Sequence, residues 1–155
     1  MLDLETLDRV DSKSMYKTYD KWAEISKNAY NSDIKIAQFK EVDHVVFVGM
    51  GGSGTLGDIF SAILSKTNIH ISIVKGYLLP KTIDKNSLVV FTSVSGNTAE
   101  TLSAIKDAME QNYNTISFSS GGSLEKFCIK NNLEFRKIEK IHSPRASFVL
   151  YLYSM

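Results

Sequence analysis

Hydroxyl side chains gather in a short loop between an apolar run and a helical pattern. The loop holds Ser93, Ser95 and Thr98 around Gly96, and it follows the apolar run 88–91. Free N–H groups at a helix start, together with short hydroxyl side chains, surround a phosphate with neutral donors while the helix dipole supplies the positive field. This loop therefore favours phosphate binding.

Helix capping is the alternative use of the same loop. Asn97 is followed three residues later by Glu100, which is an N-x-x-E version of the capping box. Capping needs one hydroxyl or amide, whereas this loop offers three hydroxyls and a glycine. We therefore assign Glu100 mainly to capping, and we assign Ser93, Ser95 and Thr98 mainly to a ligand.

A glycine-rich loop follows another apolar run. Residues 45–48 read Val-Val-Phe-Val, and Gly49, Gly51, Gly52 and Gly54 come directly after them. Glycines let the backbone turn tightly and leave N–H groups bare at a helix N-terminus, where the partial positive charge favours an anion. The loop is a second candidate for phosphate or carboxylate binding. Its alternative is a tight strand-to-helix connection without a ligand.

The glycine spacing also spells G-x-G-x-x-G, the pattern of a dinucleotide-binding unit. That pattern requires an acidic residue about 20 positions further on, at the end of the next strand. The next predicted strand, 70–74, ends in Lys75 and Gly76. The dinucleotide interpretation is therefore the weaker one, and we expect no cofactor.

Strands and helices must place these loops, and from residue 44 onward the two alternate. The predicted strands are 44–48, 70–74, 88–92, 115–119 and 134–138, and the predicted helices are 55–66, 98–112 and 123–131. Such alternation predicts an α/β fold, a three-layer α/β/α sandwich with a mostly parallel, doubly wound sheet. Ligands of such sheets bind beyond the carboxyl ends of the strands, where both loops lie.

Composition excludes several classes of protein. The net charge is +1 without a basic run, so we expect no nucleic-acid partner and no membrane partner. The single cysteine, Cys128, excludes an internal disulfide and fits a reducing compartment. The N-terminus lacks the apolar core of a signal peptide, and no apolar run is long enough to span a bilayer. We predict a cytoplasmic location and no metal.

The two loops resemble those of the SIS (sugar isomerase) domain, which has a flavodoxin-like fold. They read Gly-Met-Gly-Gly-Ser-Gly at 49–54 and Ser-Val-Ser-Gly-Asn-Thr-Ala-Glu-Thr at 93–101. The later Ser-Pro-Arg-Ala-Ser at 143–147 is similar to the first half of archaeal-type bifunctional phosphoglucose/phosphomannose isomerases. The resemblance covers about residues 40–155. It implies binding of a phosphorylated hexose and isomerisation of glucose or mannose 6-phosphate to fructose 6-phosphate.

The resemblance also implies roles for individual residues. Gly52 and Ser53 would contact the substrate, and Ser93, Ser95 and Thr98 would hold the phosphate. Arg145 matches the family arginine beside the substrate, where a fixed guanidinium stabilises negative charge on the enediolate. The alternative for Arg145 is a surface charge that follows Pro144.

Two family residues have no match here. The resemblance implies that the catalytic base, a glutamate, and the histidine that opens the sugar ring lie beyond residue 155. His44, His70 and His142 do not fall at family catalytic positions. Isomerisation needs a base poised near neutral pH, so we expect this chain to bind substrate without the family's turnover. A non-catalytic sugar-phosphate sensor is the alternative, although no DNA-reading module is evident.

Two segments flank the pattern. Residues 1–40 are predicted to be a helical lead-in that packs on the domain at 41–155, because Met15, Tyr16, Tyr19 and Trp22 recur at helical spacing. Residues 146–155 form an apolar and aromatic tail, which we expect to be exposed. We therefore predict a homodimer or association with a second SIS half.

Overall fold

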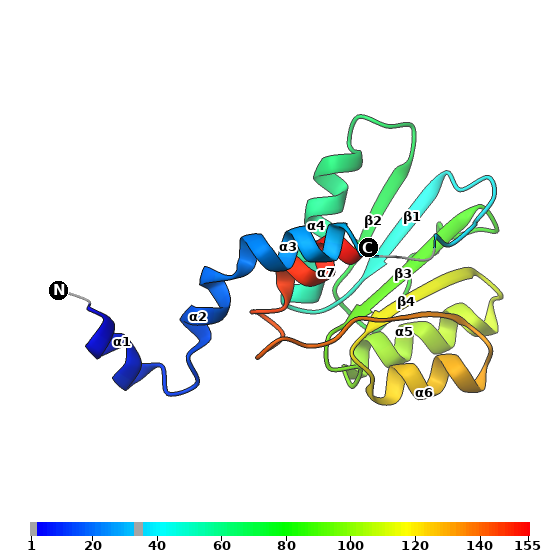
Figure 1. Ribbon diagram of the computed structural model, residues 1–155. Helices are drawn as coiled ribbons and strands as arrows, with labels where there is room; N and C mark the ends of the chain where they lie inside the picture. Colours follow the sequence, from blue (N-terminus) through cyan, green and yellow to red (C-terminus); the bar gives the residue numbers. More distant parts are fainter. Residues whose placement is uncertain (1–2, 33–35) are drawn as a thin grey trace.

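The structure, a computed structural model, describes residues 3–32 and 36–155 and contains a five-stranded parallel sheet (Figure 1). Its strands are β1 (His44–Val48), β2 (His70–Val74), β3 (Ser87–Ser93), β4 (Asn114–Ser119) and β5 (Glu134–Lys137). The strand order is β2-β1-β3-β4-β5, and every neighbouring pair is parallel. The predicted α/β fold is therefore confirmed, with the flavodoxin-like order.

Helices cover both faces of the sheet. The helices after β1 are α4 (Gly52–Leu64), α5 (Ala99–Glu110), α6 (Gly122–Lys130) and α7 (Phe148–Ser154). Side chains alternate along a strand, so Val46 and Val48 of β1 pack in the α5/α6 core, whereas Val45 and Phe47 pack in the α4/α7 core. Because both faces of β1 are buried, its sequence is continuously apolar rather than alternating.

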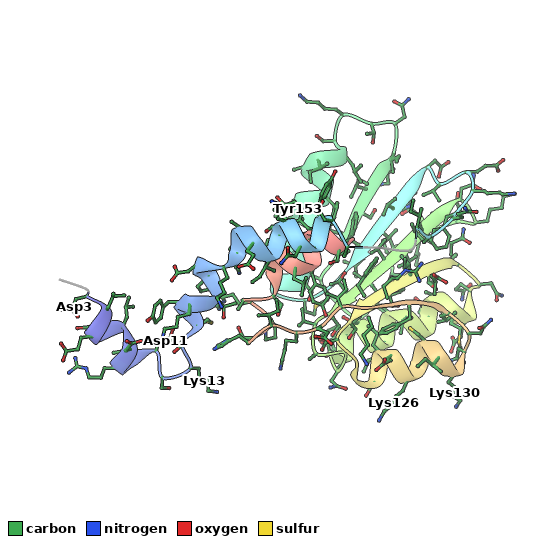
Figure 2. The ribbon with its side chains drawn as sticks, viewed as in Figure 1. Asp3, Asp11, Lys13, Lys126, Lys130 and Tyr153 are labelled. Atoms are coloured by element: carbon green, nitrogen blue, oxygen red, sulfur yellow. The ribbon has the colours of Figure 1, made fainter. Side chains whose placement is uncertain are left out.

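The lead-in forms three short helices within the described residues. They are α1 (Leu4–Val10), α2 (Met15–Asp20) and α3 (Trp22–Tyr30). α3 packs against α7, whereas no residue of α1 or α2 is buried. Figure 2 shows Asp3, Asp11 and Lys13 on the part of the lead-in that projects away from the sheet. Of these three helices, α3 therefore packs most closely on the domain.

Helix α4 begins three residues before its predicted start. The N–H of Thr55 donates to the carbonyl of Gly51 at 3.0 Å, so the helix starts inside the glycine loop. Glycine disfavours helices, which is why the sequence pattern placed the start at residue 55. Tertiary packing decides here, because a Cβ on Gly57 would lie 2.8 Å from Cβ of Phe47. Small residues let α4 approach β1 closely.

The tail is not bare, which corrects the expectation from its sequence. Residues 148–154 form α7, and Tyr151 is fully buried with its hydroxyl donating to the carbonyl of Ile138 at 2.9 Å. Leu150 and Leu152 are half-buried, because α7 packs against α3 and α4. Of the large apolar side chains in this tail, only Tyr153 is exposed. The tail therefore completes the core of this chain.

Two absences hold for residues 3–32 and 36–155. None of the helices there is both long and apolar enough to cross a membrane. No three side chains of His, Cys, Asp or Glu gather there in a way that would hold a metal ion.

Cys128 is buried and its pKa is raised by burial, as expected for an unreactive thiol.

Candidate functional site

Both loops leave the same edge of the sheet. β1 and β3 are neighbouring parallel strands, with Val48 opposite Phe91. The helices that follow them, α4 and α5, lie on opposite faces of the sheet. The strand order thus reverses between β1 and β3, and this switch point is where doubly wound sheets bind ligands.

The second loop, residues 93–98, is held by its own hydroxyls. The Ser93 hydroxyl is buried, lies 2.9 Å from the Thr98 hydroxyl and accepts from the N–H of Gly96 at 3.1 Å. Ser95 is exposed, and its hydroxyl oxygen accepts from the N–H of Asn97 at 3.3 Å. Ser95 and Thr98 therefore offer hydroxyls near the surface, while Ser93 braces the loop from behind.

The turn between β4 and α6 fixes the second loop from the side. The side-chain amide oxygen of Asn97 accepts from both the N–H and the hydroxyl of Ser123, each at 3.0 Å. Gly96 has φ +67°, and a Cβ there would lie 1.7 Å from the carbonyl oxygen of Gly121. The turn at 119–123 therefore positions the loop, a role that the sequence analysis missed although its Ser-Ser-Gly-Gly-Ser sequence could have signalled a close contact.

The capping interpretation of Asn97 and Glu100 is wrong. Thr98, not Asn97, is the residue that precedes α5, and it forms no side-chain cap. The backbone N–H of Asn97 donates to the Ser95 hydroxyl and not to Glu100, and the Asn97 side chain accepts from the N–H of Ser123 in α6 rather than from α5. The N-terminus of α5 thus carries N–H groups without a side-chain cap, and such groups attract an anion.

The first loop, residues 49–54, leaves free space around its central glycines, unlike the tightly packed second loop. Gly51 and Gly52 are exposed, and a Cβ on either would meet nothing within 4 Å. Gly49 and Gly54 differ, because a Cβ on Gly54 would lie 2.7 Å from the carbonyl oxygen of Gly49. Gly52 and Ser53 lie in the first turn of α4. The loop is therefore tightly packed at its two ends and leaves free space at its centre.

A pocket of about 390 Å³ joins the first loop to distant parts of the chain. Its lining residues are Met15, Gly52, Ser143, Pro144 and Arg145. The structure thus brings Gly52 and Arg145 together, and the Arg145 side chain is exposed. Met15 comes from the lead-in, and nothing in its sequence pattern indicated a place at this pocket.

None of the three histidines, all of which lie in the described part of the chain, lines the pocket beside the first loop. His44 lies at the opposite, amino edge, with its ring nitrogens 2.9 Å from the Ser72 hydroxyl and 3.1 Å from the Ser87 hydroxyl. Burial, and secondarily the neighbouring His70, lowers the pKa of His44. His142 lies in the segment before α7 and contacts the carbonyl of Lys13 at 3.0 Å. These contacts indicate structural roles.

The end of β2 carries no acidic residue for a nucleotide ribose. Lys75 follows the strand, and its ammonium group lies 2.7 Å from a carboxylate oxygen of Asp58. The Lys75 side chain also packs next to Gly54. A dinucleotide site needs a free acid here, so the first loop does not fit that use.

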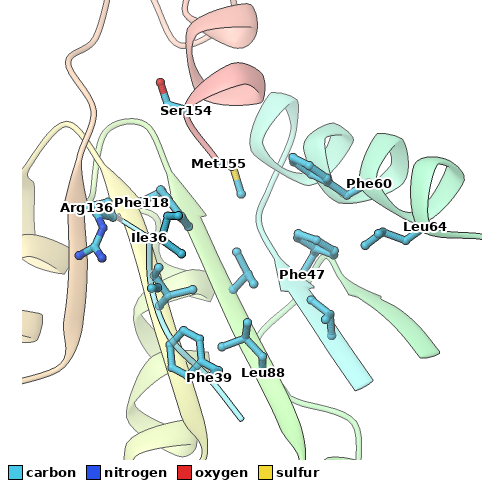
Figure 3. Close-up of a pocket in the computed structure, with 14 residues that line it drawn as sticks. Ile36, Phe39, Phe47, Phe60, Leu64, Leu88, Phe118, Arg136, Ser154 and Met155 are labelled. Atoms are coloured by element: carbon cyan, nitrogen blue, oxygen red, sulfur yellow. The ribbon is translucent and has the colours of Figure 1, made fainter. Parts of the chain in front are cut away.

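A hollow of about 460 Å³ lies on the α4/α7 face of the sheet, away from both loops. Figure 3 shows Phe39, Phe47 and Phe118 along it, with Met155 at one end. Its lining is almost wholly apolar, and its cation, Arg136, is paired with Glu134. A sugar phosphate needs polar partners, so the candidate site is the carboxyl edge rather than this hollow.

Comparison with known proteins gives a consistent result. Residues 38–153 match the SIS domain family. The chain is 34% identical over 136 residues to the bifunctional phosphoglucose/phosphomannose isomerase of Caldicellulosiruptor bescii, covering 87% of this chain and 38% of that protein. It is 32% identical to the D-glucosamine-6-phosphate 4-epimerase of Sulfolobus acidocaldarius, covering 72% of this chain and 35% of that protein.

A solved structure agrees on the fold. The C-terminal domain of glucosamine-fructose-6-phosphate aminotransferase from Francisella tularensis superposes with a TM-score of 0.69 at 18% identity, over 90% of this chain and 46% of that one. The chain spans about a third of the length of the curated relatives it matches. On the family match over residues 38–153, the chain belongs to the SIS domain family.

Proposed function

We propose that this chain binds a phosphorylated hexose at the carboxyl edge of β1 and β3, in the cytoplasm. The phosphate lies at the N-terminus of α5, where N–H groups without a side-chain cap are flanked by the hydroxyls of Ser95 and Thr98. Ser93 supports this arrangement through its contact with Thr98. The uncapped helix start within a hydroxyl loop is the observation that carries the proposal.

The sugar extends from the phosphate toward the first loop. The free space above Gly51 and Gly52 accommodates it, and Ser53 lies beside that space in the first turn of α4. Arg145 borders the same pocket as Gly52. Its guanidinium stabilises the negative charge that develops when a proton leaves the carbon next to a carbonyl.

The proposed reaction is aldose–ketose isomerisation of glucose or mannose 6-phosphate to fructose 6-phosphate, as the names of the relatives suggest. A general base must move a proton between adjacent carbons. Arg145 is the only ionisable side chain among the residues that line the pocket, all of them in the described part of the chain. We therefore propose that a second copy or a second SIS unit supplies the base and the ring-opening histidine.

A non-catalytic sugar-phosphate sensor is the competing function. A pocket whose lining contains a cation but no base suits binding as well as it suits half of an active site. Calorimetry with fructose 6-phosphate, unphosphorylated fructose and NAD tests the shared step. We expect fructose 6-phosphate to bind and the other two not to bind. If the chain binds no hexose phosphate, both the enzyme proposal and the sensor proposal are wrong.

Turnover separates the enzyme from the sensor. The chain alone should convert fructose 6-phosphate to glucose 6-phosphate about 10²- to 10⁴-fold more slowly than an intact isomerase, because it lacks a positioned base. A dehydrogenase-coupled assay measures this rate. Adding the unmatched remainder of the Caldicellulosiruptor bescii relative should raise it. Rapid turnover by the chain alone would place a base within these residues, and binding without any rescue would favour the sensor.

A further inference from the structure

The segment that carries Arg145 is a closed loop. The fully buried Ser147 hydroxyl accepts from the N–H of Ile141 at 2.8 Å and lies 2.8 Å from the carbonyl oxygen of Ser143. The N–H of Ala146 donates to the Ser143 hydroxyl at 3.3 Å. Residues 141–147 thus fold around Ser147, with Arg145 exposed on the outside.

The lead-in holds this loop from outside, across more than 120 residues of sequence. The indole N–H of Trp22 donates to the carbonyl of Ala146 at 2.9 Å. The Ser143 hydroxyl donates to the sulfur of Met15 at 3.6 Å. Figure 1 shows the blue α2 and α3 beside the orange-red segment that leads into α7. Arg145 is therefore flanked by two hydrogen bonds to the lead-in, one at Ser143 before it and one at Ala146 after it.

The lead-in also reaches the pocket itself. Met15 lines it together with Gly52 and Arg145, so one wall of the pocket comes from α2. The Trp22 ring is half-buried and packs edge-on against Tyr19 at 4.7 Å. The aromatic residues of the lead-in thus support the hydrogen bond that Trp22 makes to the carbonyl next to Arg145.

We propose that the lead-in is part of the substrate site: Trp22 is a positioning residue that fixes Arg145 over the first loop, and Met15 closes the pocket. The inference rests on the proposed function, because it gives Arg145 a substrate to meet. A long, exposed arginine loses much freedom when it binds, so fixing its backbone lowers the cost of binding. The lead-in should therefore matter for the sugar and not for the phosphate.

Trp22→Phe tests this role, since it removes the indole N–H and keeps a ring beside Tyr19. We expect fructose 6-phosphate affinity to fall about two- to tenfold, as for one lost hydrogen bond, while inorganic phosphate affinity stays unchanged. Tyr30→Phe is the matched control, because Tyr30 lies at the end of the same helix and is 74% exposed. Calorimetry measures both ligands.

The Arg145→Ala background shows whether the effect passes through Arg145. There, Trp22→Phe should change fructose 6-phosphate affinity less than about 1.5-fold, because coupled residues are not additive. An equal loss in both backgrounds, or no loss in either, would overturn the inference. If Trp22→Phe does not fold, Met15→Leu keeps the apolar wall, removes the sulfur acceptor and carries the same comparison.

Hydrogen exchange tests, without any ligand, whether Trp22 restrains the backbone of the segment that carries Arg145. The backbone amides of Ser143, Arg145, Ala146 and Ser147 should exchange faster in Trp22→Phe than in the wild type and the Tyr30→Phe control. Unchanged exchange would overturn the inference even if affinity falls. If the wild type binds no hexose phosphate, the proposed function fails, and exchange alone decides whether Trp22 fixes this segment.

Discussion

The two loops at the carboxyl edge differ in how tightly they are packed: the second loop is rigid, and the first loop leaves open space. The polar side chains of the second loop hold it in one shape, because Ser93 is bonded to Thr98 within the loop and Asn97 is bonded to Ser123 of α6. The first loop leaves open space above Gly51 and Gly52. A phosphate is always the same shape, so a rigid set of donors binds it at low entropic cost, whereas a sugar that changes during a reaction needs room.

Breaking the rigid loop should have the largest effect. Gly96→Ala places a Cβ 1.7 Å from the carbonyl oxygen of Gly121 at φ +67°. The clash and the left-handed backbone together should lower the free energy of unfolding by about 3 kcal/mol or more and abolish phosphate binding. Urea unfolding and calorimetry measure the two effects.

Gly76→Ala is the control for that experiment. A Cβ on Gly76 would meet nothing within 4 Å, and Gly76 lies outside both loops. We expect this variant to retain wild-type stability and affinity. A stable Gly96→Ala variant that still binds phosphate would contradict the rigid picture of the second loop.

Removing donors without breaking the loop should have a smaller effect. Replacing Ser95 and Thr98 together by alanine removes two hydroxyls from the proposed phosphate site but leaves the N–H groups of α5. Hydrogen bonds to a charged group contribute about 1.5 to 3 kcal/mol each, so affinity for hexose phosphates should fall at least tenfold while the fold survives.

The control is Ser65→Ala, which removes an exposed hydroxyl at the far end of α4. Calorimetry with fructose 6-phosphate and inorganic phosphate should show the same relative loss for both ligands in the double variant. A double variant with wild-type affinity would rule out Ser95 and Thr98 as phosphate ligands.

The sequence predicted features that depend on neighbouring residues, and it did not predict contacts between residues that are distant in the chain. The strand β1 and the helix start at α5 were predictable, because an apolar run and a hydroxyl loop are read within ten residues. The internal role of Ser93 was not, since its burial depends on how β3 packs. Nor was the approach of Trp22 to Ala146, because no local pattern records a contact between residues so far apart.

The burial of the tail, residues 146–155, also could not be predicted from its own sequence. Its apolar composition suggested an exposed patch, yet Tyr151 is fully buried against a core that the preceding strands build. Composition shows that a segment must be covered but not which surface covers it. For the loops, likewise, the residue types indicated a phosphate, and only the geometry separates the rigid loop from the open one.

Filling the open loop should give the smallest effect and the most specific one. Gly52→Ala adds a methyl group where nothing lies within 4 Å, so the fold should keep its stability, in contrast to Gly54→Ala, whose Cβ would lie 2.7 Å from the Gly49 carbonyl oxygen. If the sugar occupies that space, the added methyl group crowds it, so fructose 6-phosphate affinity should fall about fivefold, which corresponds to roughly 1 kcal/mol, the low end of the cost of overpacking. Inorganic phosphate should bind as in the wild type, since its donors belong to the other loop. Titration of both ligands, with thermal unfolding as the check on the fold, decides the matter: an equal loss for both ligands would mean that the two loops do not divide phosphate from sugar.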